Sequence, residues 1–245
     1  MGNANHFPRH IERHNIDALA MERLTKSAFV VDIYSFCGNS GIFEFSTQGS
    51  LNSYRRIENR TAINNFNVIF QAAHALADFH GMDIEYPSIV HNDIKPSQFV
   101  LIDGVYKLND FNKAQFIPKN TITNKPCMVK NVVPKSSGTF RSPEEFAGKT
   151  LNEKVDIYAF GNTVYTILTG QWPFQNENNI RVHNRVIRGE RAKLPEEITT
   201  SRNPCIQALV EVFVLSQEQE VTERISADEI VEKLRSYQNA CQSSV

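Results

Sequence analysis

The sequence has little net charge, few cysteines and no long apolar run. Its formal charge is -1 over 245 residues, which gives no electrostatic basis for binding nucleic acid or an anionic membrane. The four cysteines show neither the close pairing of a zinc site nor the density of a disulfide scaffold, and this favours a cytoplasmic location. No apolar run reaches the roughly 18 residues that span a bilayer. We therefore expect a globular protein with no nucleic-acid partner and no membrane span in this chain.

Apolar periodicity predicts three helices. Residues 11–25 and 61–80 carry apolar side chains at helical spacing, which indicates amphipathic helices. Residues 153–169 are apolar nearly all round and are followed by Gly170, which predicts a buried helix with an ordinary end. The segments FVVDIYSF and GIFEF, after the first helix, are short and rich in β-branched and aromatic residues, as strands are.

A β-hairpin is predicted where the sequence is QFVLIDGVYKL. Asp103 and Gly104 can supply the two positive φ angles of a tight turn, so the arms on either side run antiparallel. The polar stretch 112–142 has no periodicity and is predicted to be a long functional loop. Ser226 and Glu229 form a capping box that predicts the start of a last helix.

The hairpin brings the residues before its first strand close to those after its second. Asp93 and Asp110 should therefore face one mouth, with carboxylates within about 10 Å. Around them, HNDIKPSQF (91–99) and LNDFNKA (108–114) resemble the catalytic loop and the metal-binding Asp-Phe-Gly segment of eukaryotic-type protein kinases. Further segments match that family in the same order, namely SPEEF (142–146), KVDIYAFGNTVYTILTGQWPF (154–174) and Arg224.

This resemblance implies an α+β, protein-kinase-like fold of the serine/threonine type. A mainly helical carboxy-terminal lobe with a β-hairpin would span residues 47–240. Residues 1–46 would form a partial amino-terminal lobe that keeps one helix, corresponding to the C helix of the family, and two strands. ATP and Mg²⁺ are the implied cofactors, and a protein substrate or signalling partner is the implied partner.

The resemblance also implies catalytic roles. Asp93 would accept the proton of the substrate hydroxyl as it attacks the γ-phosphate, and Lys95 would offset the charge that develops there. Asp110 would hold Mg²⁺, a task suited to a hard carboxylate oxygen. Gln98 stands where the family has an asparagine as second metal ligand, and its longer side chain places the amide oxygen about one methylene away.

Other matched residues would hold the scaffold together. Glu144 should form a buried ion pair with Arg224. Asp156 should accept hydrogen bonds from the backbone of the catalytic loop and so fix Asp93. The hydrophobic spine of the family is traced through Ile33, Met21, Phe111 and His91 to Asp156.

The family pattern breaks at the amino-terminal end. The chain has no Gly-x-Gly, no strand ending in lysine precedes Asp17, and three strands need roughly 25 residues where only sixteen are present. Asp17, at the position of the C-helix glutamate, is thus predicted to lack its lysine partner. Val100 could still supply the lower wall for adenine, and the backbone near Glu44 could supply the hinge hydrogen bonds.

Three further departures concern the loops. Asn92 replaces the arginine that in many kinases binds an activation-loop phosphate, so loop phosphorylation is expected to be a weaker switch. Asn112 replaces the glycine after Asp-Phe, and asparagine tolerates unusual backbone angles. The segment GTFRSPE is about two residues shorter than usual, which leaves the docking role of Thr139 unassigned.

Two functions fit these features. The first is a protein serine/threonine kinase whose ATP-gripping strands are missing from this chain, with Asp93, Lys95 and Asp110 retained for chemistry. The second is a catalytically dead pseudokinase that serves as a protein-binding scaffold, favoured by the absent lysine and glycine loop. A small-molecule phosphotransferase ranks third, because Glu144, Arg224 and the activation segment argue against it.

Overall fold

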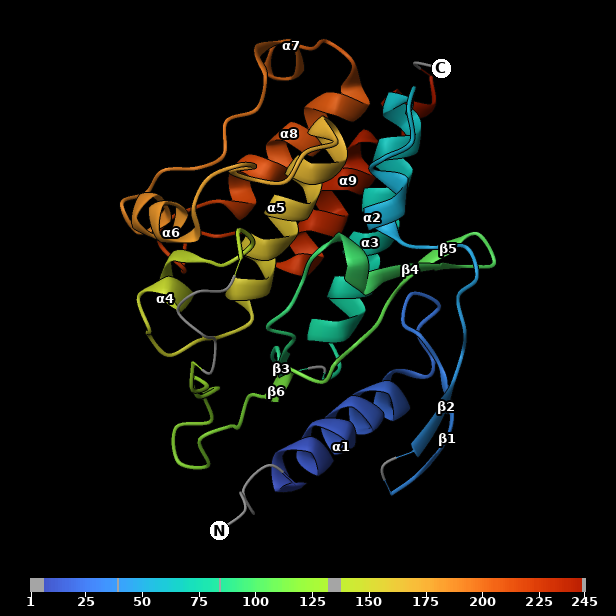
Figure 1. Cartoon of the computed structure of the whole chain (residues 1–245), viewed down its shortest axis with the longest axis vertical. Helices are drawn as coiled ribbons and strands as arrows, with labels where there is room; N and C mark the ends of the chain where they lie inside the picture. The colour runs from blue at the N-terminus through green and yellow to red at the C-terminus, as the bar shows by residue number, and fades with distance from the viewer. Residues whose placement is uncertain (1–6, 39, 84, 132–137, 244–245) are drawn as a thin grey trace.

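The computed structural model describes residues 7–38, 40–83, 85–131 and 138–243. Figure 1 shows a body of helices at one end of the molecule, with a single helix and a strand pair at the other end. This is the predicted α+β arrangement. Within the described residues, no helix combines the length and the apolar character needed to cross a bilayer.

The helical body is built from four long helices: α3 (Ala62–His80), α5 (Lys154–Thr169), α8 (Pro204–Ser216) and α9 (Ala227–Gln242). Every residue of α5 from 155 to 167 is buried, which confirms the predicted all-round apolar helix. Gly170 ends it with a left-handed φ of 73°, a conformation that glycine adopts without strain. The capping box of Ser226 and Glu229 starts α9 as predicted.

The predicted hairpin is present as β4 (Phe99–Ile102) and β5 (Val105–Leu108). Asp103 and Gly104 take the expected positive φ values of 49° and 82°. The hairpin packs on α3, where the side chain of Gln71 accepts a hydrogen bond from the backbone N–H of Tyr106. The open end of the hairpin, which we call its mouth and which lies between Asp93 and Asp110, is thereby held at a fixed position on the helical body.

The opposite end contains α1 (Phe7–Leu24) and the antiparallel pair β1 (Ile33–Cys37) and β2 (Ser40–Phe43). The first half of the predicted strand FVVDIYSF does not belong to β1. Residues 29–31 instead run beside the hairpin, with hydrogen bonds from Val31 N to Leu108 O and from Leu108 N to Phe29 O. These bonds tie the small end to the body.

The predicted long loop 112–142 contains more structure than its composition indicates. Strand β6 (Gln115–Phe116) pairs with β3 (Ile89–Val90), directly before the catalytic-loop segment. An isolated bridge joins Val129 to Leu151. Residues 132–137 of this stretch lie outside the described residues.

Short helices complete the chain. The structure describes α2 (Leu51–Tyr54), the 3-10 helix η1 (Pro96–Gln98), α4 (Pro143–Phe146), α6 (Asn179–Ile187) and α7 (Glu196–Thr199). One core cluster includes Met21 of α1, Phe111 and helices of the body, so α1 is packed on the body as well as on β1. The boundary proposed between residues 46 and 47 stays a prediction.

Candidate active site

The backbone of the catalytic-loop segment is anchored on Asp156 of α5. Its carboxylate accepts hydrogen bonds from His91 N at 2.7 Å and Asn92 N at 2.9 Å, and it also contacts His80 Nε2 at 3.0 Å. The hydrogen bonds predicted from the loop backbone to Asp156 are therefore present. Asn92 has a left-handed φ of 63°, which asparagine tolerates better than most residues, and this turn directs the next residue, Asp93, toward the hairpin mouth.

Asp93 and Asp110 meet at the mouth of the hairpin as predicted. The amide nitrogen of Gln98 donates to Asp93 Oδ2 at 3.0 Å and to Asp110 Oδ2 at 3.1 Å, so one donor bridges both carboxylates. This geometry places the two carboxylates well within the expected 10 Å. Asp110 also has a left-handed φ, of 67°, and this is a strained backbone held in place by its surroundings.

The carboxylate of Asp93 accepts from three cationic side chains. Lys95 Nζ lies 2.7 Å and Lys113 Nζ 2.8 Å from Oδ2, and Arg141 Nη2 lies 3.3 Å from Oδ1. Burial alone would raise the pKa of Asp93, but hydrogen bonds and charge from Lys113 and Lys95 outweigh it, so its pKa lies below the usual range. Asp93 is therefore ionised at neutral pH, as a proton acceptor must be.

Lys113 and Arg141 were not predicted from the sequence to lie at this site. Lys113 lies three residues after Asp110, within a segment that matched the family, but the match assigned it no role. Arg141 lies in the shortened GTFRSPE segment and also bonds Glu145 Oε1 at 2.9 Å. The sequence did show a basic residue close to each motif, and this was a signal that could have pointed to them. Periodicity, however, does not predict where the charged end of a long flexible side chain lies.

Asp17 has a partner that the sequence analysis did not foresee. Its Oδ1 accepts a 2.7 Å hydrogen bond from the backbone N–H of Phe111, so the carboxylate is bonded to the metal-site segment rather than to a lysine. Burial raises the pKa of Asp17, the bond from Phe111 lowers it, and the nearby Asp110 charge raises it; the net shift is upward. Asp17 thus positions Phe111 from α1.

The two residues predicted to contact adenine lie at the edge of the hairpin. Val100 is half-buried in β4 and forms a bridge with Ser50. The N–H of Glu44 donates to Asp32 O at 2.9 Å, and its side chain forms an ion pair with Lys107 at 2.7 Å. Because this N–H is committed to the backbone, a hinge contact would have to use the carbonyl of Glu44.

The predicted buried ion pair is present. Arg224 donates to both oxygens of Glu144, at 2.6 and 3.2 Å, and its guanidinium also contacts the carbonyl oxygens of Lys154 and Glu218. Its side chain is 0% exposed. The spine residues His91 and Phe111 are fully buried, with ring centroids 5.4 Å apart. Burial lowers the pKa of His91, which keeps its imidazole neutral.

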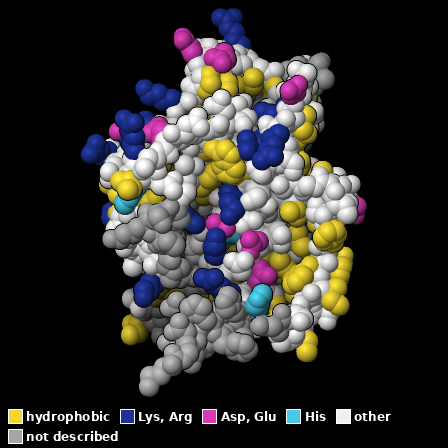
Figure 2. Space-filling view, in the orientation of Figure 1, with side chains coloured by type: hydrophobic (Ala, Val, Ile, Leu, Met, Phe, Trp, Pro, Cys, Tyr) yellow, Lys and Arg dark blue, Asp and Glu magenta, His cyan; other side chains and the backbone are white. Residues whose placement is uncertain are grey.

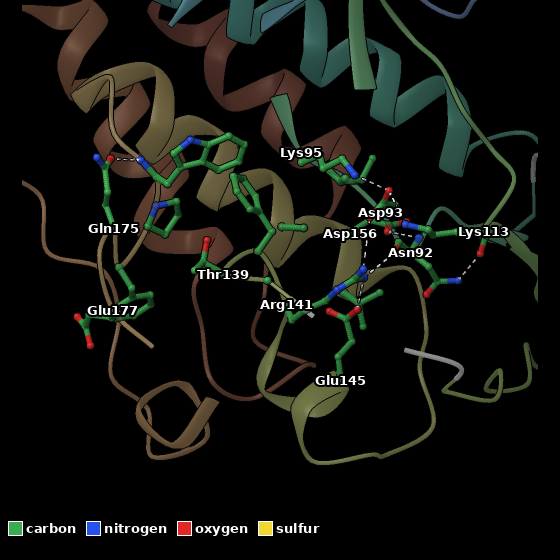
Figure 3. A pocket seen from close by; sticks show the side chains of 18 of the residues that line it. Asn92, Asp93, Lys95, Lys113, Thr139, Arg141, Glu145, Asp156, Gln175 and Glu177 are labelled. Atoms are coloured by element: carbon green, nitrogen blue, oxygen red, sulfur yellow. Dashed lines mark hydrogen bonds and ion pairs between the residues drawn. The ribbon is translucent and has the colours of Figure 1, made fainter. Parts of the chain in front are cut away.

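A cavity of about 600 Å³ opens beside Asp93. Figure 3 shows Asp93, Lys95, Lys113 and Arg141 along one side of it and Gln175 and Glu177 on the other. Phe140 and Trp172 also line the cavity, and they pack edge to face with ring centroids 5.1 Å apart. Thr139 also lines the cavity. The cavity is large enough to receive a peptide side chain next to Asp93.

The donor set at the mouth fits Mg²⁺ held jointly with phosphates. Mg²⁺ in phosphotransfer sites takes one or two carboxylates and completes its shell with phosphate oxygens and water. Asp110 supplies such a carboxylate, and Gln98 supplies an amide oxygen if its side-chain amide turns over. Among the described residues no group of three acidic, histidine or cysteine side chains forms a protein-only metal cage.

Comparison with known proteins identifies related sequences. The protein kinase domain family matches residues 10–234. The chain is similar to serine/threonine-protein kinase pkpA of Phycomyces blakesleeanus, at 29% identity over 78% of this chain and 29% of that protein. It is also similar to Aurora kinase of Eremothecium gossypii, at 26% identity over 69% of this chain and 43% of that protein.

A third relative is the tyrosine-protein kinase MasK of Myxococcus xanthus, at 35% identity over 45% of this chain and 18% of that protein. The chain spans less than half the length of each of these three relatives. The matched range of the family extends from α1 to α9 and includes every residue at the hairpin mouth.

Proposed function

The chain belongs to the eukaryotic-type protein kinase family, and from this premise we propose that it transfers the γ-phosphate of ATP to serine or threonine hydroxyls of proteins. The observation that carries the proposal is the bridge from Gln98 to both Asp93 and Asp110, because it joins the proton acceptor and the metal-site carboxylate. A cytoplasmic location belongs to the same proposal, on the cysteine usage of the sequence.

Asp93, Lys95 and Asp110 each have one task in this reaction. The acceptor hydroxyl loses its proton to Asp93 as its oxygen bonds to the γ-phosphorus and the bond to the ADP oxygen breaks. Lys95 offsets the negative charge on the transferring phosphoryl group. Asp110 would hold Mg²⁺, which neutralises phosphate charge when bound. Gln98, whose amide nitrogen donates to Asp93 and Asp110, would keep these two carboxylates together.

The candidate residues of this chain would contact only one side of a bound nucleotide. Val100 and the Glu44 carbonyl would contact adenine, while Asp17 accepts a bond from Phe111 N where the family pattern has an ion pair with a strand lysine. Positioning supplies most of the rate in phosphoryl transfer. We therefore expect this 245-residue chain alone to bind Mg-ATP weakly and to transfer phosphate slowly.

A second candidate function is a pseudokinase scaffold. Apolar side chains on and beside β1 and β2 face solvent, including Tyr34, Ile42 and Phe45, which are 67%, 64% and 82% exposed. Figure 2 shows apolar side chains gathered on the side of the molecule where Figure 1 places these strands. Exposed apolar surface of this kind favours a contact with another protein.

Radiolabelled phosphate transfer to a generic protein substrate distinguishes the two functions. Asp93→Asn serves as the blank, and Asp103→Asn is the matched control because it makes the same exchange at the closed end of the hairpin. The kinase proposal expects slow transfer that D103N retains and D93N loses. Transfer no greater than the blank would favour the scaffold. Fast turnover would contradict the expectation that rapid transfer needs the ATP-gripping strands of the family pattern.

Phosphoamino acid analysis of the labelled substrate then tests the acceptor. Phosphoserine and phosphothreonine are expected. Phosphotyrosine alone would overturn the serine/threonine assignment while leaving phosphoryl transfer intact.

A further inference from the structure

Lys113 has no part in the reaction described so far, yet its ammonium group lies in the active site. Figure 3 shows the side chains of Lys95 and Lys113 converging on the carboxylate of Asp93. Both ammonium groups contact the same oxygen, Oδ2, at 2.7 and 2.8 Å. The proposed reaction uses Lys95 at the γ-phosphate and leaves Lys113 without a task.

The Oδ2 atom of Asp93 carries more donors than it can keep during the reaction. Gln98 Nε2 is a third donor, at 3.0 Å. A carboxylate oxygen offers about two lone-pair sites, so three donors already exceed that number. An acceptor hydroxyl that gives its proton to this oxygen needs one of those positions. At least two of the three donors must therefore leave Oδ2 before transfer, and the proposed reaction moves only Lys95, to the γ-phosphate.

Among the groups around Asp93, Lys113 is the freest to leave. Gln98 is buried, and Arg141, with a side chain 12% exposed, is held by Glu145. The Lys113 side chain is 43% exposed, against 34% for Lys95. Its ammonium can therefore swing away from Asp93 at little cost in lost packing.

The base of the Lys113 side chain is fixed. Its carbonyl oxygen accepts a 3.1 Å hydrogen bond from Asn92 Nδ2, and Ala114 N bonds Phe111 O at 2.9 Å in the same turn. The Cα of Lys113 is thus tied to the loop that holds Asp93 and to the segment that holds Asp110. Only the flexible side chain of Lys113 is then free to move.

We propose that Lys113 is a phosphate-binding residue, whose ammonium group leaves Asp93 and binds the γ-phosphate of ATP when nucleotide and acceptor enter. The proposal rests on the proposed function, which puts the γ-phosphate between Asp93 and Asp110. Exchange of a carboxylate for a phosphate keeps the ammonium paired with an anion and frees Oδ2 for the hydroxyl.

The test compares ATP with ADP, because ADP lacks the γ-phosphate. Displacement of a fluorescent methylanthraniloyl-ADP by Mg-ATP and by Mg-ADP gives both affinities for the full chain. Lys113→Gln is expected to weaken Mg-ATP roughly tenfold, the size of one charge-assisted hydrogen bond, and to leave Mg-ADP within about twofold. Lys113→Arg, which keeps the charge, should retain most of the ATP affinity.

Lys193→Gln is the matched control, since Lys193 is exposed and lies outside the cavity. It should change neither affinity. Equal losses for ATP and ADP in Lys113→Gln, or no loss for either, would overturn the role of Lys113 and leave the proposed function standing. If the wild-type chain binds neither nucleotide, the proposed function itself fails, and this inference fails with it.

Discussion

The acidic side chains of the helical body have different hydrogen-bond partners from Asp17, which lies at the end formed by α1, β1 and β2. In the body, Asp156 accepts two backbone N–H groups and contacts a histidine, and Glu144 accepts two bonds from Arg224. At the other end, Asp17 accepts one backbone N–H and its pKa is raised by burial. Asp156 and Glu144 thus have several hydrogen-bond partners each, whereas Asp17 has a single backbone donor and a raised pKa.

The same contrast holds for apolar side chains. Every residue of α5 from 155 to 167 is buried, while aromatic residues of β1 and β2 face solvent. A two-stranded sheet is only marginally stable by itself. The helical body thus holds the catalytic-loop segment in place, and the end formed by α1, β1 and β2 contributes less to the stability of this chain.

The largest expected effect tests the buried ion pair of the body. Arg224→Ala would leave Glu144 buried without its charge partner, at a cost of roughly 3 to 5 kcal/mol in the free energy of unfolding. Urea denaturation followed by circular dichroism measures the change. Arg235→Ala is the control, because Arg235 forms an exposed pair with Glu232 on α9 and its loss should be barely measurable. Equal stability of the two variants would contradict a structural role for Arg224.

The next effect concerns Asp156. In Asp156→Asn one side-chain oxygen is replaced by an NH₂ group, which faces a backbone N–H of the catalytic loop instead of accepting from it. A buried donor left unsatisfied costs roughly 1 to 3 kcal/mol, so the urea midpoint should fall. The loss of an anchor should also reduce phosphate transfer. The D103N variant should match wild type in both measurements, and similar behaviour of D156N would show that the anchor is dispensable.

A smaller effect is expected from His91 as the pH falls. Burial lowers its pKa, although the charge of Asp156 acts in the opposite direction. The unfolded chain therefore takes up a proton at a higher pH than the folded chain, so His91 stabilises the fold above about pH 6.5 and this contribution is lost below it.

Urea midpoints of wild type and His91→Phe, taken at about pH 7.5 and about pH 5.5, test this expectation. The variant should lose less stability over that interval than wild type. His74, whose pKa burial also lowers, accounts for part of the remaining dependence. An identical loss in both proteins would rule out His91 as a contributor.

The smallest effect is expected at α1. In Asp17→Asn the amide oxygen can still accept from Phe111 N, while the buried charge is removed. Because the folded state raises the pKa of Asp17, the variant should be as stable as wild type or slightly more stable at neutral pH. Thermal unfolding at neutral pH measures this. A marked destabilisation would show that the charge is compensated as well as that of Asp156, and would remove the contrast between the two ends.

Local pattern was sufficient to predict the elements that carry the site. The turn at Asp103 and Gly104 fixed the hairpin, and the all-round apolar sequence of α5 predicted its burial. Given the hairpin, the meeting of Asp93 with Asp110 follows, because antiparallel arms bring their outer ends together. The pairing of Glu144 with Arg224 came from the ordered match to a family. The predicted kinase fold is confirmed by the family match over residues 10–234.

The sequence by itself thus determined helices α1, α3 and α5, the start of α9, the hairpin and the approach of the two aspartates. Tertiary structure alone decided the bond from Phe111 to Asp17, the use of Asn92 rather than Asn112 for a left-handed backbone, and the convergence of Lys113 and Arg141 on Asp93. The physical reason is the separation along the chain between the residues that interact. Periodicity and turn chemistry act over a few residues, whereas these contacts join positions between about 20 and 94 residues apart and depend on the path of the whole chain.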